Sequence, residues 1–158
     1  MRRVRGFSLI ELLIVVAIIL IIAAIAVPSY LHARIEANES SAVGSLRTVN
    51  TAQITFNSSY PTVGYAGSLT ALGGSSCSPP NASSACLIDT LLAGGLKSGY
   101  TFSLAGASGT PNATYQLMAT PNLWDVSGIR YFCSFQDAVV RYSLTTITTC
   151  DATVSSLN

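Results

Sequence analysis

One carboxylate, Glu11, is the residue for which the sequence most clearly demands a chemical role. It lies near the start of an apolar stretch, and sixteen consecutive apolar residues follow it from Leu12 to Val27. An ionised carboxylate at the centre of a bilayer costs about 2.5–3.5 kcal/mol on insertion scales, and charges inside membranes are therefore normally paired. The sequence thus predicts that Glu11 has a positively charged partner, a route to the membrane interface, or a function of its own.

The other residues able to do chemistry do not combine into a catalytic or metal site. His32 is the only histidine, and without a nucleophile near it we interpret it as a solvated or interface residue. No loop has the closely spaced acidic ligands that calcium requires, and no two cysteines have the short spacing of zinc ligands. We therefore expect no metal, no cofactor and no enzymatic activity. The scattered aspartates, each of which fits a turn or a cap, are Asp89, Asp125, Asp137 and Asp151.

The element that carries Glu11 is an N-terminal hydrophobic segment, residues 7–27. As an α-helix this segment is about 30 Å long, which matches the hydrocarbon core of a bilayer, so we expect it to span a membrane once. Basic residues in front of such a segment stay on the cytoplasmic side, and the rest of the chain is then exported. The basic residues here are Arg2, Arg3 and Arg5.

The heptapeptide GFSLIEL at residues 6–12, with its short basic leader and the apolar run that continues to Pro28, resembles the class III signal of type IV pilins and pseudopilins. The resemblance implies that a prepilin peptidase cuts between Gly6 and Phe7 and methylates the new amine of Phe7. It also implies that Glu11 neutralises the Phe7 amine of an adjacent subunit during assembly. The carboxylate would then have the partner that its surroundings require.

The same resemblance implies partners and locations for the whole protein. The partners are further copies of the chain in a homopolymeric filament, the prepilin peptidase, and the inner-membrane assembly platform with its ATPase. The protein would be a single-pass inner-membrane protein before assembly and part of an extracellular pilus or a periplasmic pseudopilus afterwards. It would be a structural subunit and a substrate of the peptidase.

Alternatives remain open at this point. Within the family, the chain could be a pseudopilin of a type II secretion system or a minor pilin. Ala24-Ile25-Ala26 also fits an ordinary signal-peptidase site, which would release a soluble domain beginning at Val27, although the apolar run exceeds the ~7–15 residues of a secretory signal. A plain membrane anchor that carries a binding or enzymatic domain is a further alternative.

After Pro28 the apolar pattern becomes one-sided and predicts an amphipathic helix over residues 28–59. Tyr60-Pro61 should end it, because the residue before a proline avoids the helical region. Pro28 should kink or locally open the helix, since its ring removes a backbone donor. The predicted buried face contains Ile35, Ala42, Leu46, Val49, Phe56 and Tyr60. The polar residues expected largely on other faces are Glu36, Glu39, Arg47 and Asn50.

Residues 60–158 are expected to form a globular domain with a loop region, a short helical turn over 87–92, and a four-stranded antiparallel sheet. Packing the apolar face of this sheet on the helix gives an α+β fold. The predicted strands are Tyr100–Ala105, Thr114–Ala119, Ile129–Phe135 and Val139–Leu144. The predicted organisation is therefore a leader at 1–6, a transmembrane and filament-core helix at 7–27, an amphipathic helix at 28–59 and a globular domain at 60–158.

Four cysteines in an exported domain indicate disulfides, because the compartments outside the inner membrane are oxidising. Three pairings are possible, and we favour Cys77 with Cys86 and Cys133 with Cys150. The second pair would resemble the disulfide-bounded C-terminal region of many pilins.

Charge argues against a nucleic-acid site. A chain beginning at Phe7 would carry five basic and seven acidic side chains, which is not the basic pattern of a nucleic-acid-binding protein. Sparse charge suits a subunit that buries much of its surface against copies of itself. The sequence does not distinguish adhesion, twitching, DNA uptake, secretion or conduction as the role of such a filament.

Overall fold

The computed structural model describes residues 7–74 and 77–157, and the predicted leader at 1–6 lies outside this range. The chain divides into two compact units, with the division between Arg34 and Ile35. The longest element is α1 (Leu9–Ser59), a helix of 51 residues. It ends at Ser59, directly before Tyr60-Pro61, which confirms the predicted end of the long helix.

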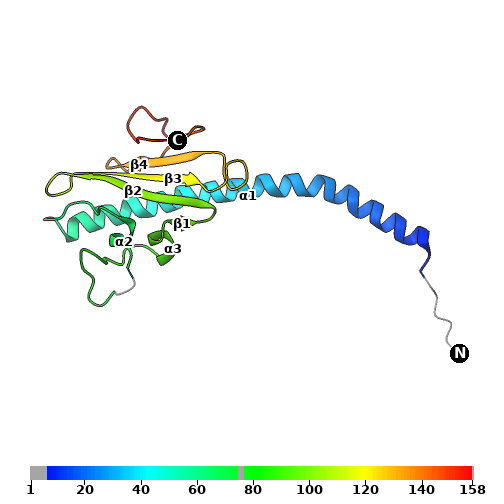
Figure 1. Ribbon diagram of the computed structural model, residues 1–158, viewed down its shortest axis with the longest axis horizontal. Coiled ribbons are helices and arrows are strands. Elements are labelled where there is room, and N and C mark those ends of the chain that lie inside the picture. Colours follow the sequence, from blue (N-terminus) through cyan, green and yellow to red (C-terminus); the bar gives the residue numbers. More distant parts are fainter. Residues whose placement is uncertain (1–6, 75–76, 158) are drawn as a thin grey trace. The chain divides into compact units, whose positions relative to one another are not determined.

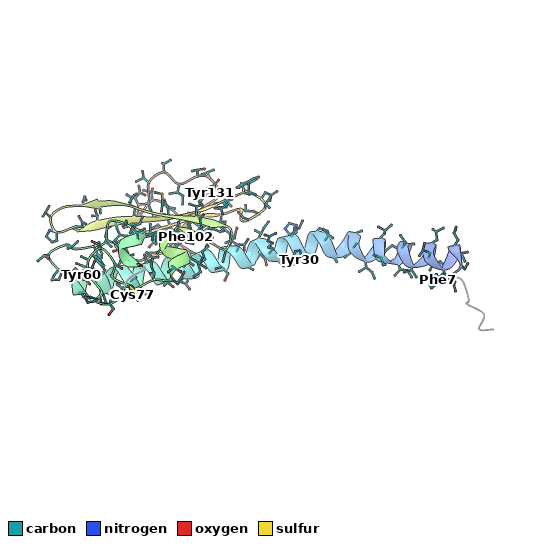
Figure 2. All side chains as sticks on the ribbon, turned by 60° about the horizontal axis from the view of Figure 1, so that its bottom comes forward. Phe7, Tyr30, Tyr60, Cys77, Phe102 and Tyr131 are labelled. Carbon is teal, nitrogen blue, oxygen red and sulfur yellow. A yellow bond between two sulfur atoms is a disulfide. The ribbon has the colours of Figure 1, made fainter. Side chains whose placement is uncertain are left out.

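In the first unit, the apolar side chains of α1 are exposed to solvent all round the helix. Figure 2 shows these side chains, including Phe7 and Tyr30, pointing away from the helix axis. Among the described residues, α1 is the one helix long and apolar enough to cross a membrane. The helix continues through Pro28, and the kink at this residue stays a prediction.

In the second unit, α1 buries a single face. The buried positions recur every three or four residues, as expected for one side of a helix. They are Ile35, Glu39, Ala42, Ser45, Leu46, Val49, Asn50, Ala52, Gln53 and Phe56. All the apolar positions predicted for this face within α1 are therefore confirmed.

A five-stranded antiparallel sheet in the order β1-β2-β3-β4-β5 packs on that face. Figure 1 shows its strands running alongside the C-terminal part of α1. The α+β fold is thus confirmed. The strands are β1 (Leu96–Lys97), β2 (Tyr100–Ser108), β3 (Thr114–Pro121), β4 (Tyr131–Phe135) and β5 (Arg141–Ser143).

The predicted number of four strands is wrong by one, because β1 was not expected. This strand has only two residues, too few to show any periodicity, and it pairs with the start of β2. The connecting residues Ser98 and Gly99 have φ angles of 49° and 74°. Two consecutive residues with positive φ form the tight hairpin turn whose twist suits antiparallel strands. The Ser98-Gly99 dipeptide was therefore the signal for an additional hairpin.

The core joins α1 to the inner face of the sheet. Phe102 on β2 faces Ala119 on β3, and Ala119 in turn faces Phe132 on β4. All three are buried in one apolar cluster with Leu46 and Phe56 of α1. Through this packing the sheet covers one face of the C-terminal part of α1.

Two polar residues of α1 correct the sequence prediction. Glu39 and Asn50, expected on other faces, are buried in the core face. Asn50 donates from Nδ2 to Ser134 Oγ at 2.9 Å and accepts from the Tyr115 hydroxyl at 3.1 Å. Buried polar groups are tolerated when they are hydrogen-bonded. Hydrogen-bond partners from the sheet and its loops therefore allow these two side chains to face the core. The local sequence pattern of α1 does not contain these partners.

The segment between α1 and the sheet is fixed to the helix by Gln53. Its Nε2 donates to the Ala66 carbonyl at 3.0 Å, and its Oε1 accepts from the Ala66 N–H at 2.8 Å. Two short helices follow, α2 (Leu69–Leu72) and α3 (Thr90–Ala93). The second overlaps the helical turn predicted over residues 87–92 and extends one residue beyond it, and Asp89 caps its N-terminus.

Candidate functional site

The candidate site is the N-terminus of α1, where the sequence places Gly6, Phe7 and Glu11. Phe7 precedes the first helical residue and is exposed. Gly6 lies outside the described residues, so the structure does not describe the proposed scissile bond.

Glu11 caps its own helix. Its Oε2 accepts a hydrogen bond from the Ser8 backbone N–H at 2.9 Å. The Ser8 carbonyl in turn accepts the first helical bond, from the Leu12 N–H at 3.2 Å. This is the Glu half of a capping box, in which an acidic side chain at the third helical position satisfies the N–H of the capping residue.

The role of Ser8 was not predicted, although the sequence contained the signal. A Ser followed three residues later by Glu, just before an apolar run, is the sequence signature of a capping box. In the separated chain, Glu11 thus stabilises the first turn of α1. Among the described residues no basic side chain forms an ion pair with it, so the carboxylate keeps acceptor capacity for a cation from outside this chain.

Both disulfides lie in the second unit. Cys77 is joined to Cys86 within the segment before α3, and Cys133 on β4 is joined to Cys150 in the C-terminal segment. This is the pairing that we favour from the sequence. Cys133 and Cys150 are buried, whereas Cys77 is exposed. The Cys133–Cys150 disulfide therefore forms part of the packed core, whereas the Cys77–Cys86 disulfide cross-links a surface loop.

Two of the aspartates, Asp89 and Asp137, hold local structure. The Leu92 N–H and the Lys97 ammonium hydrogen-bond the Asp89 carboxylate and hold its pKa below the usual value. Burial raises the pKa of Asp137, but hydrogen bonds from Arg141 and Val139 outweigh burial and leave that pKa lowered. Within residues 7–74 and 77–157, no three His, Cys, Asp or Glu side chains gather as metal ligands.

Glu39 holds a loop of the sheet against α1, and sequence reasoning missed this contact. Its Oε1 accepts from the backbone N–H groups of Ile129 and Arg130 at 2.9 and 3.0 Å, and its Oε2 accepts from Arg130 Nε at 2.7 Å. Because these two N–H groups bond to a carboxylate, β4 begins at Tyr131 and not at the predicted Ile129. The nearby Tyr100 hydroxyl donates to the Arg130 carbonyl at 2.8 Å.

Two pairs of aromatic rings pack within the second unit. Phe56 and Tyr60 have ring centroids 4.8 Å apart, and Tyr100 and Phe132 have centroids 5.9 Å apart. Burial raises the pKa of the Tyr100 phenol, which stays neutral and acts as a hydrogen-bond donor in the core. These rings belong to the core of the second unit.

Comparison with known proteins identifies the N-terminal segment. The family model described as the prokaryotic N-terminal methylation motif matches residues 1–27. The type IV major pilin protein PilA of Myxococcus xanthus is 50% identical over 54 residues, which is 34% of this chain and 24% of that protein. The type IV wide pilus major component PilA4 of Thermus thermophilus is 58% identical over 40 residues, which is 25% of this chain and 30% of that protein.

These matches span about a quarter of the first relative and less than a third of the second. No solved structure matches this chain. The methylation motif covers the residues whose chemistry the sequence singles out, Phe7 and Glu11. The N-terminal 27 residues of this chain thus carry the methylation motif of prokaryotic prepilin signals, and a third of the chain is similar to a type IV major pilin.

Proposed function

We propose that this protein is a structural subunit of a type IV pilus or a pilus-like filament. In this proposal a prepilin peptidase cuts between Gly6 and Phe7 and methylates the Phe7 amine, and the apolar part of α1 then forms the filament core. The N-terminal methylation motif and the similarity to type IV major pilins support this function. The protein would have no catalytic activity of its own.

One structural observation carries the proposal. The apolar side chains of α1 in the first unit are exposed all round the helix, whereas the second unit has a complete core of its own. Exposed apolar area of this extent is unstable in water. A bilayer can cover it before assembly, and the same segments of neighbouring subunits can cover it in a filament.

Glu11 supplies the electrostatic part of the proposal. In the separated chain its carboxylate accepts a hydrogen bond from the Ser8 N–H alone among the contacts described. A carboxylate in apolar surroundings gains most from an opposite charge. We propose that the methylated amine of Phe7 from an adjacent subunit provides that charge and so sets the register between neighbouring helices.

The finer points follow from this function and belong to the same proposal. The subunit would wait in the inner membrane as a single-pass protein, and an assembly platform with its ATPase would move it into an extracellular pilus or a periplasmic pseudopilus. Pro28 would allow the helix to bend where its apolar part ends.

The test compares Glu11→Ala with Glu36→Ala, a second exposed glutamate of α1. Cells that produce only the variant chain are examined for filaments by shearing and electron microscopy, and the mature chain is examined by N-terminal sequencing and intact mass. We expect both variants to begin at methylated Phe7 and only Glu11→Ala to lose filaments. Normal filaments from Glu11→Ala would contradict the register role, and a mature chain that begins at Val27 would contradict the whole proposal.

A further inference from the structure

The Glu11 carboxylate lies close to the backbone nitrogen of Phe7. Glu11 Oε2 accepts a hydrogen bond from the Ser8 N–H at 2.9 Å. The Phe7 nitrogen precedes the Ser8 nitrogen by one residue, and consecutive backbone nitrogens are about 2.7–3.7 Å apart in every allowed conformation. The Phe7 nitrogen therefore lies within about 7 Å of Glu11 Oε2 while the helix keeps its observed shape.

The second carboxylate oxygen of Glu11, Oε1, has acceptor capacity for this nitrogen. Among the described residues, the Ser8 N–H is the one hydrogen-bond donor to Glu11, and no basic side chain forms an ion pair with it. Successive backbone nitrogens commonly bind one anion between them. The Ser8 N–H and an amine at Phe7 form such a successive pair, so a single carboxylate can accept from both.

Phe7 can turn its nitrogen toward Glu11 without disturbing α1. It precedes the helix, which begins at Leu9, and it is 78% exposed. If Phe7 is the first residue of the chain, its nitrogen carries no preceding peptide. Rotation about the Cα–C bond of Phe7 then moves the amine alone, because this bond is one of the soft dihedrals of the backbone.

Electrostatics favour this contact in apolar surroundings. An α-amino group is protonated at neutral pH, and Glu11 is followed by apolar residues from Leu12 to Val27. Each charge is costly in such surroundings without a partner, and charge-assisted hydrogen bonds between opposite charges offset much of that cost. A single subunit has no neighbour to supply a partner, whereas its own chain then carries both charges.

We propose that cleavage creates an internal ion pair in the mature, unassembled subunit. In this pair the Phe7 amine donates to Glu11 Oε1 of the same chain, while the Ser8 N–H holds Oε2. The inference rests on the proposed cleavage between Gly6 and Phe7 and goes beyond the proposed pairing between copies. The amine leaves its own Glu11 for that of an adjacent subunit as the filament forms, and this exchange keeps the number of ion pairs constant.

An apolar carbodiimide detects the internal ion pair, because it joins an amine to a carboxylate where the two are in contact. The carboxylate adds to the carbodiimide carbon, and the amine nitrogen then forms an amide bond with the Glu11 carbonyl carbon. The carbodiimide leaves as its urea, with one carboxylate oxygen and both protons of the methylated ammonium. A pair within one chain gives a cyclic monomer that is lighter by one water molecule, and a pair between chains gives linked copies.

The reaction is carried out on the mature chain from cells that lack the assembly ATPase, in detergent with micelles in large excess over protein. We expect the cyclic monomer, with the new amide located between Phe7 and Glu11 by fragment mass spectrometry. It should exceed linked copies by about a hundredfold, because groups on one chain meet at millimolar effective concentration and separate chains are micromolar. Sheared filaments treated in the same way should give linked copies instead.

Matched controls test each part of the internal ion pair. Glu11→Gln keeps the size of the side chain without its charge, and the uncleaved precursor has a peptide nitrogen at Phe7, so neither should form the Phe7–Glu11 amide. Ser8→Pro removes the N–H that holds Oε2, whereas Ser8→Ala keeps it. The cyclic product should fall several-fold in Ser8→Pro alone. The intact mass of each chain before the reaction verifies its N-terminus.

The contrary outcomes separate this inference from the proposed function. If the isolated mature chain begins at Phe7 but yields no cyclic monomer, the internal ion pair is wrong and the proposed function stands. Equal cyclisation of Ser8→Pro and Ser8→Ala would overturn the geometry in which the Ser8 N–H holds the carboxylate. If filaments yield cyclic monomers and no linked copies, the pairing between copies is wrong and the internal ion pair stands. If the mature chain begins at Val27, both fail.

Discussion

The N-terminal and C-terminal parts of α1 both carry leucines and other large apolar side chains. The two parts differ in how far the rest of the chain covers these side chains. In the first unit Leu20 is 63% exposed, and apolar side chains lie on every side of the helix. In the second unit Leu46 is fully buried, and the apolar residues lie on the one face that the sheet covers. Apolar side chains stabilise a fold only where other groups bury them away from water. The chain thus covers the apolar side chains of one part of its helix and leaves those of the other part exposed.

The two acidic residues Glu11 and Glu39 make the same contrast in electrostatic terms. Glu39 accepts three hydrogen bonds from Ile129 and Arg130, far away in the sequence. Glu11 accepts one local bond, from the Ser8 N–H. The carboxylate in the folded domain is thus satisfied by its own chain, and the one in the apolar segment is left with capacity for an external partner.

The largest expected effect comes from truncating equivalent leucines in the two parts of the helix. Leu46→Ala should lower the free energy of unfolding of the second unit by about 3–5 kcal/mol, because it leaves a cavity in a packed core. Leu20→Ala should leave that free energy unchanged. Urea unfolding of the full chain in detergent, followed by circular dichroism, measures both. Equal destabilisation by the two substitutions would remove the basis of the comparison.

The next largest expected effect on stability comes from removing a disulfide. Both disulfides belong to the second unit. Cys133→Ala/Cys150→Ala should cost about 3 kcal/mol in the chain-entropy account, since the bond joins residues 17 apart. Cys77 is exposed and Cys133 is buried, so a mild reductant should open the Cys77 bond first. Mass spectrometry after timed thiol alkylation measures the order. Simultaneous opening of both bonds under native conditions would show that the Cys133 bond is not protected by the core.

Glu39→Gln tests the electrostatic contrast directly. The amide keeps one acceptor oxygen but loses the charge that holds two backbone N–H groups and the Arg130 guanidinium, so we expect a loss of about 2 kcal/mol. Glu11→Gln should not change the free energy of unfolding of the second unit. The same urea titration measures both variants, and amide hydrogen exchange at Ile129 and Arg130 should accelerate only in Glu39→Gln. Unchanged exchange at these amides would argue that the carboxylate does not fix the loop.

The smallest expected effect is the dependence of the second unit's stability on pH. The pKa values of Asp89 and Asp137 are lowered in the folded chain, for the reasons given above. A carboxyl whose folded pKa lies below its unfolded value of about 3.9 contributes stability above that pH and loses it as the pH falls through the folded pKa. The urea midpoint should therefore decrease below about pH 4, and less steeply in Asp137→Asn. A midpoint that rises on acidification would contradict the sign.

Local patterns were sufficient for the elements whose cause is local. Tyr60-Pro61 predicted the end of α1, and alternating residues predicted the β2–β3 and β4–β5 hairpins. Two local signals were present but not used, the capping box of Ser8 with Glu11 and the tight turn at Ser98-Gly99. Both are short-range features of backbone geometry, which explains why they could have been found without a structure.

Other features could not be derived from local pattern, because their causes are distant in the sequence. Glu39 meets Ile129 and Arg130 across about ninety residues, and Asn50 meets Ser134 across 84. A prediction from helical periodicity uses only the polarity of each side chain. It therefore places these two polar side chains in solvent. Their burial depends on partners that only the assembled sheet provides.

The sequence by itself determined that the chain has an apolar N-terminal helix with one acidic residue, because length, hydropathy and motif are properties of consecutive residues. It also determined the alternation of strands, since the direction of side chains follows the backbone repeat. Only the tertiary structure decided that Glu39 and Asn50 face inward and that Leu123, Trp124 and Val126 are held outward. Those positions depend on hydrogen bonds between segments that folding alone brings together.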